Sequence, residues 1–179
     1  MNEKAEVRLG NDTDQALTNI PIVSYDDGIP LYNCDIIGLD DVTIKLENLH
    51  ITGNLVLGDR ANLINVHAGG SIIIGNNADT GHLVSGEDII IGKDSEINNI
   101  TAGSDVTIGS NAIIWNVFSG GNITIGDTAK TRELFALGSI EIGKNSISCK
   151  LKAGESITIQ GGFSQQDKIP EFKSTFVFG

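Results

Sequence analysis

Apolar and polar positions alternate along this chain in a pattern that returns at every seventeenth position. Seven consecutive copies of one segment begin at residues 53, 70, 87, 104, 121, 138 and 155, and they read GNLVLGD, GSIIIGN, EDIIIGK, SDVTIGS, GNITIGD, GSIEIGK and ESITIQG. In each copy two apolar residues flank a variable one, as Ile123 and Ile125 flank Thr124. This alternation predicts a short β-strand with one buried face.

Two further pairs of inward positions follow in each repeat. The second pair is a small residue followed by a larger one (Ala112 and Ile114), and the third is an apolar residue followed by a small one (Val117 and Ser119). Three short strands with a turn at each corner make one coil, and successive coils stack parallel and in register. We therefore predict an all-β fold, a triangular parallel β-helix (β-solenoid) of about seven 17-residue coils. Parallel crossovers favour a right-handed coil, although left-handed β-helices exist.

Two more columns of the repeat fall at the expected corners. Glycine follows the first strand of each coil, where we expect a positive φ, at positions 58, 75, 92, 109, 126 and 143. Asparagine lies between the second and third strands at positions 48, 65, 99 and 116, and His82, Glu133 and Lys150 interrupt this column. Stacked asparagine amides can hydrogen-bond from coil to coil.

The repeat divides the chain into four parts. Residues 42–160 form the β-solenoid domain, and the polar residues 1–19 are expected to be a flexible N-terminal tail. Residues 20–41 are apolar but out of phase, so we expect them to cap the first coil or to shield apolar side chains along it. Residues 161–179 leave the repeat and are expected to form a C-terminal cap or an assembly strand.

Charge and cysteine content narrow the possible partners. A net charge of −11 repels phosphate backbones and anionic lipids, so we expect no nucleic acid partner and no membrane association. No apolar run is long enough to span a bilayer, and the N-terminus lacks the pattern of a secretory signal. Cys34 and Cys149 differ in repeat phase and indicate a reducing compartment, so we expect a cytoplasmic protein.

Two families resemble the repeat unit. The stretch IGSNAII at 108–114 resembles the hexapeptide repeat of left-handed β-helix acyltransferases, but that family needs coils in multiples of six. The whole unit AGSDVTIGSNAIIWNVF at 102–118 looks more like bactofilins, and this resemblance extends over residues 42–160. It implies a right-handed triangular β-helix that associates end to end as a bacterial cytoskeletal polymer. The polar start at Met1–Lys4 departs from the membrane-seeking tails of that family.

The chemistry-bearing side chains do not form a recognisable catalytic arrangement. We find no nucleophile with a base, no paired carboxylates and no phosphate-binding loop, so we expect no enzymatic activity, no cofactor and no metal. His50 and His67 share an outward column about 5 Å apart, but no third ligand follows in that column. An outward threonine row resembles the arrays of ice-binding solenoids, and ordinary β-propensity explains it better.

Exposed apolar columns are the candidate interaction sites. Val56, Ile73 and Ile90 form one stripe, Trp115, Phe118 and Phe135 form another near a corner, and the C-terminal segment adds Phe163, Phe176 and Phe178. Such surface marks contacts between molecules unless the tails of the chain cover it. Our leading hypothesis is a structural, self-assembling cytoskeletal or scaffold subunit whose partner is itself, joined end to end. The alternatives are a rigid fibre or adhesion module of a phage tail or cell surface and, less favoured, a hexapeptide-type acyltransferase.

Overall fold

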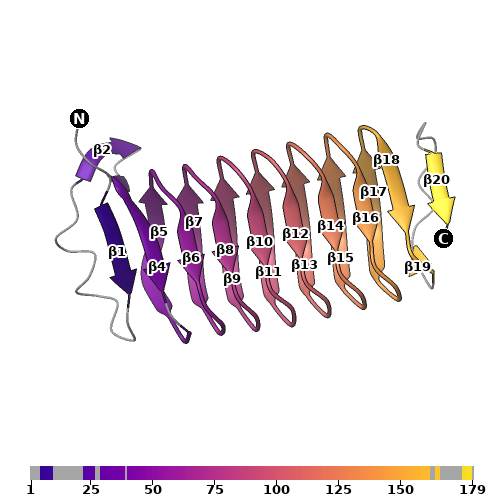
Figure 1. Cartoon of the computed structure of the whole chain (residues 1–179), viewed down its shortest axis with the longest axis horizontal. Coiled ribbons are helices and arrows are strands. Elements are labelled where there is room, and N and C mark those ends of the chain that lie inside the picture. Colours follow the sequence, from indigo (N-terminus) through magenta and orange to yellow (C-terminus); the bar gives the residue numbers. More distant parts are fainter. Residues whose placement is uncertain are drawn as a thin grey trace.

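The computed structural model describes residues 5–9, 22–26, 29–38, 40–161, 164–165 and 175–178. Within these residues the protein is an all-strand, parallel β-solenoid of about seven turns, in which equivalent strands stack along one axis (Figure 1). No helix in the described part of the chain is long and apolar enough to cross a membrane. The fold class predicted from the 17-residue repeat is confirmed.

Two ten-stranded sheets run along the solenoid. The short-strand sheet contains, in spatial order, β1 (Ala5–Leu9), β4 (Cys34–Gly38), β6 (Leu55–Leu57), β8 (Ile72–Ile74), β10 (Ile89–Ile91), β12 (Val106–Ile108), β14 (Ile123–Ile125), β16 (Ile140–Ile142), β18 (Ser156–Ile159) and β20 (Thr175–Phe178). The long-strand sheet contains, in the same direction, β2 (Ile22–Asp26), β3 (Ile29–Tyr32), β5 (Thr43–Ile51), β7 (Asn62–Ala68), β9 (Asp79–Ser85), β11 (Glu96–Ala102), β13 (Ile113–Ser119), β15 (Lys130–Ala136), β17 (Ile147–Ala153) and β19 (Ser164–Gln165).

The stacking register follows the sequence repeat. Ile91 pairs with Ile74 on one side and with Ile108 on the other, and each partner is the equivalent residue of the adjacent repeat. All three inward pairs predicted for each coil are buried in the repeats from 55 to 136, and they form one continuous core along the axis. The core is therefore a stack of mainly aliphatic side chains, with buried serine and threonine at some of the small positions, each side chain packed on its equivalent one coil away.

One detail of the expected coil is wrong. The second and third predicted strands are a single seven-residue strand, as in β13, where Ile114 and Val117 are both buried although three residues apart. The in–out alternation shifts by one position at Asn116, so the corner expected there is a bend inside a continuous strand. The bend keeps both halves of the strand facing the core.

The corner glycines act differently from the prediction. None of those at positions 75, 92, 109, 126 and 143 has a positive φ, and a Cβ at Gly109 would lie 2.5 Å from the backbone nitrogen of Lys93 in the preceding coil. The positive φ falls two residues after the corner glycines, at Arg60, Asn77, Asp94, Asn111, Thr128 and Asn145, and also at Asp41 in the first coil. Glycine is needed here because successive backbones approach closely, while the turn itself is carried mainly by asparagine and aspartate, which tolerate this conformation.

The described parts of both termini extend the sheets. We expected residues 1–19 to be a flexible tail, but Ala5–Leu9 forms β1, which pairs with β4 and buries Val7 and Leu9. β2 pairs antiparallel with β3, and β3 pairs with β5, so this segment extends the long-strand sheet at its N-terminal end. At the other end β19 pairs with β17 and β20 pairs with β18.

The first coil is longer than the others. Equivalent residues of β4 and β6, such as Ile36 and Leu55, are 19 positions apart, and the register of β5 against β7 shifts between Ile44 and Asn48. β4 therefore belongs to the stack, although its sequence does not fit the 17-residue columns. The solenoid begins before residue 42, the boundary expected from the repeat.

Candidate interaction surfaces

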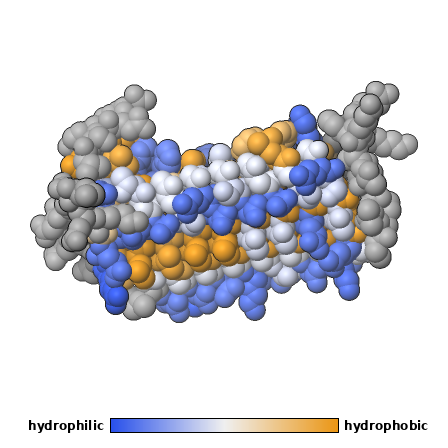
Figure 2. All heavy atoms as spheres, turned by 45° about the horizontal axis from the view of Figure 1, so that its top comes forward, coloured by the Kyte–Doolittle hydropathy of each residue, from blue (hydrophilic) through white to orange (hydrophobic). Residues whose placement is uncertain are grey.

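The aliphatic stripe (Val56, Ile73 and Ile90) lies along the middle of the short-strand sheet. The three residues pair in sequence across β6, β8 and β10, and Ile73 and Ile90 are 38% and 43% exposed. Ile37 precedes Val56 in the same column, and the repeat did not reveal it because the first coil is longer than the others. Figure 2 shows apolar side chains gathered in a row along the N-terminal half of the face in view.

The same column changes character in the C-terminal half of the sheet. Thr107 pairs with Thr124, which pairs with Glu141, and Thr158 follows. A polar hollow of about 300 Å³ lies there, lined by Asp105, Thr107, Asn122, Ile123, Thr124, Ser139 and Glu141. The threonine row is outward, as expected, and the Glu141 carboxylate in it accepts a hydrogen bond from the Gln160 amide at 3.1 Å. An acidic group interrupts the flat hydroxyl array.

The aromatic residues lie on both sides of the strand bend. The rings of Phe118 and Phe135 stack with their centroids 5.0 Å apart and an interplanar angle of 5°. The Lys152 ammonium lies 4.9 Å from the Phe135 centroid, a cation–π contact that continues the column. Trp115 lies on the other side of Asn116 in β13 and is 51% exposed. The predicted aromatic cluster is therefore a phenylalanine pair and a separate tryptophan.

Trp115 belongs to a second apolar surface, on the long-strand sheet. A hollow of about 360 Å³ is lined by Ile113, Ile114, Trp115, Lys130, Thr131, Arg132, Ile147 and Cys149. The repeat pattern did not select Ile113, Lys130, Arg132 or Ile147, because their columns mix acidic, apolar and basic residues. A search for variable outward columns, rather than uniform ones, would have found them.

The histidine pair is placed as the repeat predicts. The His50 and His67 rings are 5.1 Å apart, edge to face, at one end of a hollow of about 340 Å³ that also contacts Leu31 and Thr52. In the described part of the chain, no three histidine, cysteine, aspartate or glutamate side chains come close enough together to hold a metal ion.

Side-chain ladders run along the corners. The Asn122 carboxamide oxygen accepts the Ser139 backbone N–H at 2.9 Å, and the Asp105 carboxylate accepts the Asn122 N–H at 2.7 Å. The predicted asparagine column is also bonded, with Asn116 donating to Asn99 at 2.7 Å, and His82 joins this column instead of interrupting it. These contacts tie each coil to the next outside the core.

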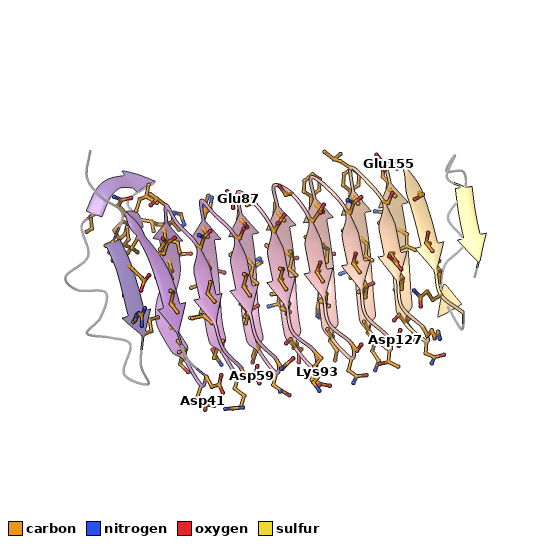
Figure 3. The ribbon with its side chains drawn as sticks, in the orientation of Figure 1. Asp41, Asp59, Glu87, Lys93, Asp127 and Glu155 are labelled. Carbon is orange, nitrogen blue, oxygen red and sulfur yellow. The ribbon has the colours of Figure 1, made fainter. Side chains whose placement is uncertain are left out.

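Charged residues follow the corners on both edges of the solenoid (Figure 3). Asp41, Asp59, Lys93 and Asp127 lie along one edge, and Glu87 and Glu155 lie along the opposite edge. The Arg60 guanidinium donates two hydrogen bonds to the Asp41 carboxylate and thereby lowers the pKa of that carboxyl. The backbone N–H and the amide of Asn76 lower the pKa of Asp59 in the same way.

Two of the three C-terminal phenylalanines lie in the described part of the chain. Phe163 lies outside the described residues. Phe176 and Phe178 lie in β20, at register positions opposite the buried Ile157 and Ile159 of β18. The repeat ends after Ile159, but β18 is not the edge of its sheet, because β20 pairs with it.

Comparisons with family models, with curated proteins and with solved structures find no match for this chain. Its function is therefore inferred from the surfaces described above.

Proposed function

We propose that this protein is a structural subunit that joins end to end with copies of itself into a cytoskeletal or scaffold-type polymer, as the resemblance of its repeat to bactofilins suggests. The observation that carries the proposal is the ten-stranded parallel sheet that starts at β1 and finishes at β20. In the described chain each of these two strands has a neighbour on one side. Terminal strands of a solenoid offer backbone groups on which another chain can add.

The direction of the backbone groups favours head-to-tail joining. The Ala5 N–H donates to the Asn33 carbonyl, so alternate residues of β1 face β4, and the N–H and C=O groups of Glu6 and Arg8 project away from the molecule. The Gln160 N–H donates to the Ile142 carbonyl, so Thr158 and Gln160 bond towards β16, and Ile157 and Ile159 bond towards β20. In the parallel register of β18 and β20 the backbone groups of Thr175 and Val177 then face β18, and those of Phe176 and Phe178 project outward. A β20 strand could thus pair with β1 of a second copy and continue the sheet. A contact between two different ends generates a filament instead of a closed dimer.

Blocking one edge tests the proposal. Proline at Arg8 removes an outward N–H while leaving the inward bonds of β1 in place. We expect wild-type protein to form particles that lengthen with concentration in the micromolar range, by light scattering and electron microscopy, and Arg8→Pro to abolish this growth. The matched control is Arg8→Ala, which loses the same ion pair with Glu6 but keeps the N–H, and it should still assemble. Wild-type protein that stays monomeric would contradict end joining and favour a rigid fibre or adhesion module.

A further inference from the structure

One outward face of the long-strand sheet carries a graded pattern of charge. We define the lateral face as two neighbouring outward columns of β9, β11, β13, β15 and β17. The first column contains, in coil order, Asp79, Glu96, Ile113, Lys130 and Ile147. The second contains Gly81, Asn98, Trp115, Arg132 and Cys149. The face is therefore acidic on its N-terminal side, apolar in the middle, and basic and apolar on its C-terminal side.

The surrounding sequence has the same asymmetry. From 61 to 129 a single cation, Lys93, stands among Asp79, Glu87, Asp88, Asp94, Glu96, Asp105 and Asp127. From 130 to 152 the cations are Lys130, Arg132, Lys144, Lys150 and Lys152, against Glu133 and Glu141. The chain has a net charge of −11, so the sign of the charge in this basic segment is opposite to that of the chain as a whole.

The charges of the lateral face have no partners within the described residues. Ion pairs there involve Arg8, Arg60 and Lys150, and neither Glu96, Lys130 nor Arg132 forms a side-chain hydrogen bond or an ion pair. Between them, Ile113 and Trp115 are 40% and 51% exposed. Exposed aromatic and arginine side chains beside an apolar hollow are typical of contact surfaces.

We propose that the lateral face binds the lateral face of a second copy of this chain, with the two solenoids antiparallel. A two-fold axis that lies in the plane of the interface, over β13 and parallel to its strand direction, turns the two lateral faces towards each other and reverses the coil order in the second copy. Glu96 lies one coil before Ile113 and Lys130 one coil after it, so each Glu96 faces Lys130 of the second copy. The interface is isologous, and both ion pairs form at once.

The parallel arrangement is disfavoured by the same charges. An axis along the solenoid would place each coil opposite the same coil of the second copy, so that acidic coils would face acidic coils and Lys130 and Arg132 would face their own kind. Like charges in contact across an interface oppose association and select against the wrong orientation. The acidic-to-basic order along the lateral face therefore sets the orientation.

The apolar part of the face supplies the contact surface. Trp115 lies at the proposed axis, and the hollow beside it is bounded by Ile113, Arg132 and Ile147. In the antiparallel dimer, Trp115 of the second copy faces Trp115 and can fill this hollow. The contact uses the side of the solenoid, so it is separate from end joining and would form even if the ends did not bind.

A charge swap tests the pairing. Glu96→Lys alone places two cations opposite each other, and Lys130→Glu alone places two carboxylates opposite each other. We expect each single variant to weaken dimerisation at least ~10-fold in sedimentation equilibrium, and the double variant E96K/K130E to recover within ~3-fold of wild type. The matched control is Glu141→Lys, the same substitution on the short-strand sheet, which should leave dimerisation unchanged. The series is measured in the Arg8→Pro background, so that end joining does not contribute.

Tryptophan fluorescence provides a second readout of the same contact. The chain has 1 tryptophan, so an emission shift to shorter wavelength with rising concentration reports the burial of Trp115. We expect this shift in wild type, its loss in either single variant and its return in the double variant. A chain that stays monomeric at ~1 mM would overturn the proposal. A dimer whose affinity and tryptophan emission do not change when Glu96 or Lys130 is substituted would also overturn it. So would a double variant that does not regain the wild-type affinity.

Discussion

At the scale of single residues, the corner glycines leave no room for a side-chain atom. A Cβ on Gly109 would approach the backbone of Lys93 and Gly92 to between 2.5 and 2.8 Å, and real Cβ atoms do not come that close to backbone atoms. The preceding coil cannot move away, because the core residues on both sides of the corner are packed against it. These glycines set how tightly the coils stack.

Gly109→Ala tests this steric role. We expect it to lower the free energy of unfolding by about 1–3 kcal/mol, the usual cost of forcing an extra group into packed structure, measured by urea denaturation. Gly161→Ala is the control because, among the described residues other than its chain neighbours, no atom lies within 4 Å of the position that its Cβ would take, and it should change stability by less than about 0.5 kcal/mol. Equal effects at the two positions would mean that close coil contact does not require glycine.

At the scale of elements, the acidic corner at the N-terminal end makes stability depend on pH. The pKa of Asp59 lies below its ordinary value of 3.8, chiefly because the Asn76 backbone N–H donates to the carboxylate. A group with a lowered pKa in the folded state stabilises the fold above its unfolded pKa. That contribution is lost as the pH falls below about 4 and through the folded pKa.

The difference in the free energy of unfolding between wild type and Asp59→Asn should disappear at acidic pH. We expect the variant to be less stable than wild type at pH 6 and to approach it at pH 3, in urea denaturation at both pH values. Asp79→Asn removes one charge whose carboxylate makes no hydrogen bond within the described chain, and it controls for net charge. A stability gap for Asp59→Asn that is unchanged between the two pH values would contradict this assignment.

The sequence predicts the elements well where a column repeats, and poorly elsewhere. The inward pairs, such as Ile123 and Ile125, follow from periodicity alone because burial requires the same apolar position in each coil. β1 was missed since its partner β4 is separated from it by a segment that lies outside the phase of the repeat. The lateral face was missed because charge order along a column is not periodic, so Lys130 gives no signal until its neighbours in space are known.

At the scale of the whole molecule, the strands that the structure describes pair only with strands next to them in the stack, never across several coils. Apart from the antiparallel β2–β3 pair at the N-terminal end, each strand pairs with its equivalents in the adjacent coils, so every central coil has two neighbours and the terminal coils have fewer stabilising contacts. Such a structure behaves approximately as a one-dimensional array, in which stability is a sum of coil and interface terms. Loss of structure should begin at the ends.

Amide hydrogen exchange can measure this gradient. We expect protection to be greatest in β10 and β12 and to decrease outward towards β4 and β18, with the pattern resolved by mass spectrometry of peptides. Peptides of equal burial from the two regions are the internal control, because the inward residues of β4 and β12 are equally inaccessible. Uniform protection along the solenoid would instead indicate that the whole molecule opens as one unit.

Because the stacking register is constant, the length of this molecule is set by the number of its coils. Each 17-residue unit adds one layer of about 4.8 Å, so a duplication or loss of one whole unit would change the length by one step and leave the ends as they are. Any other number of residues would have to be absorbed as in β5, where the register shifts between Ile44 and Asn48. The length of the solenoid can therefore change during evolution by whole coils, without any change to the residues at either end.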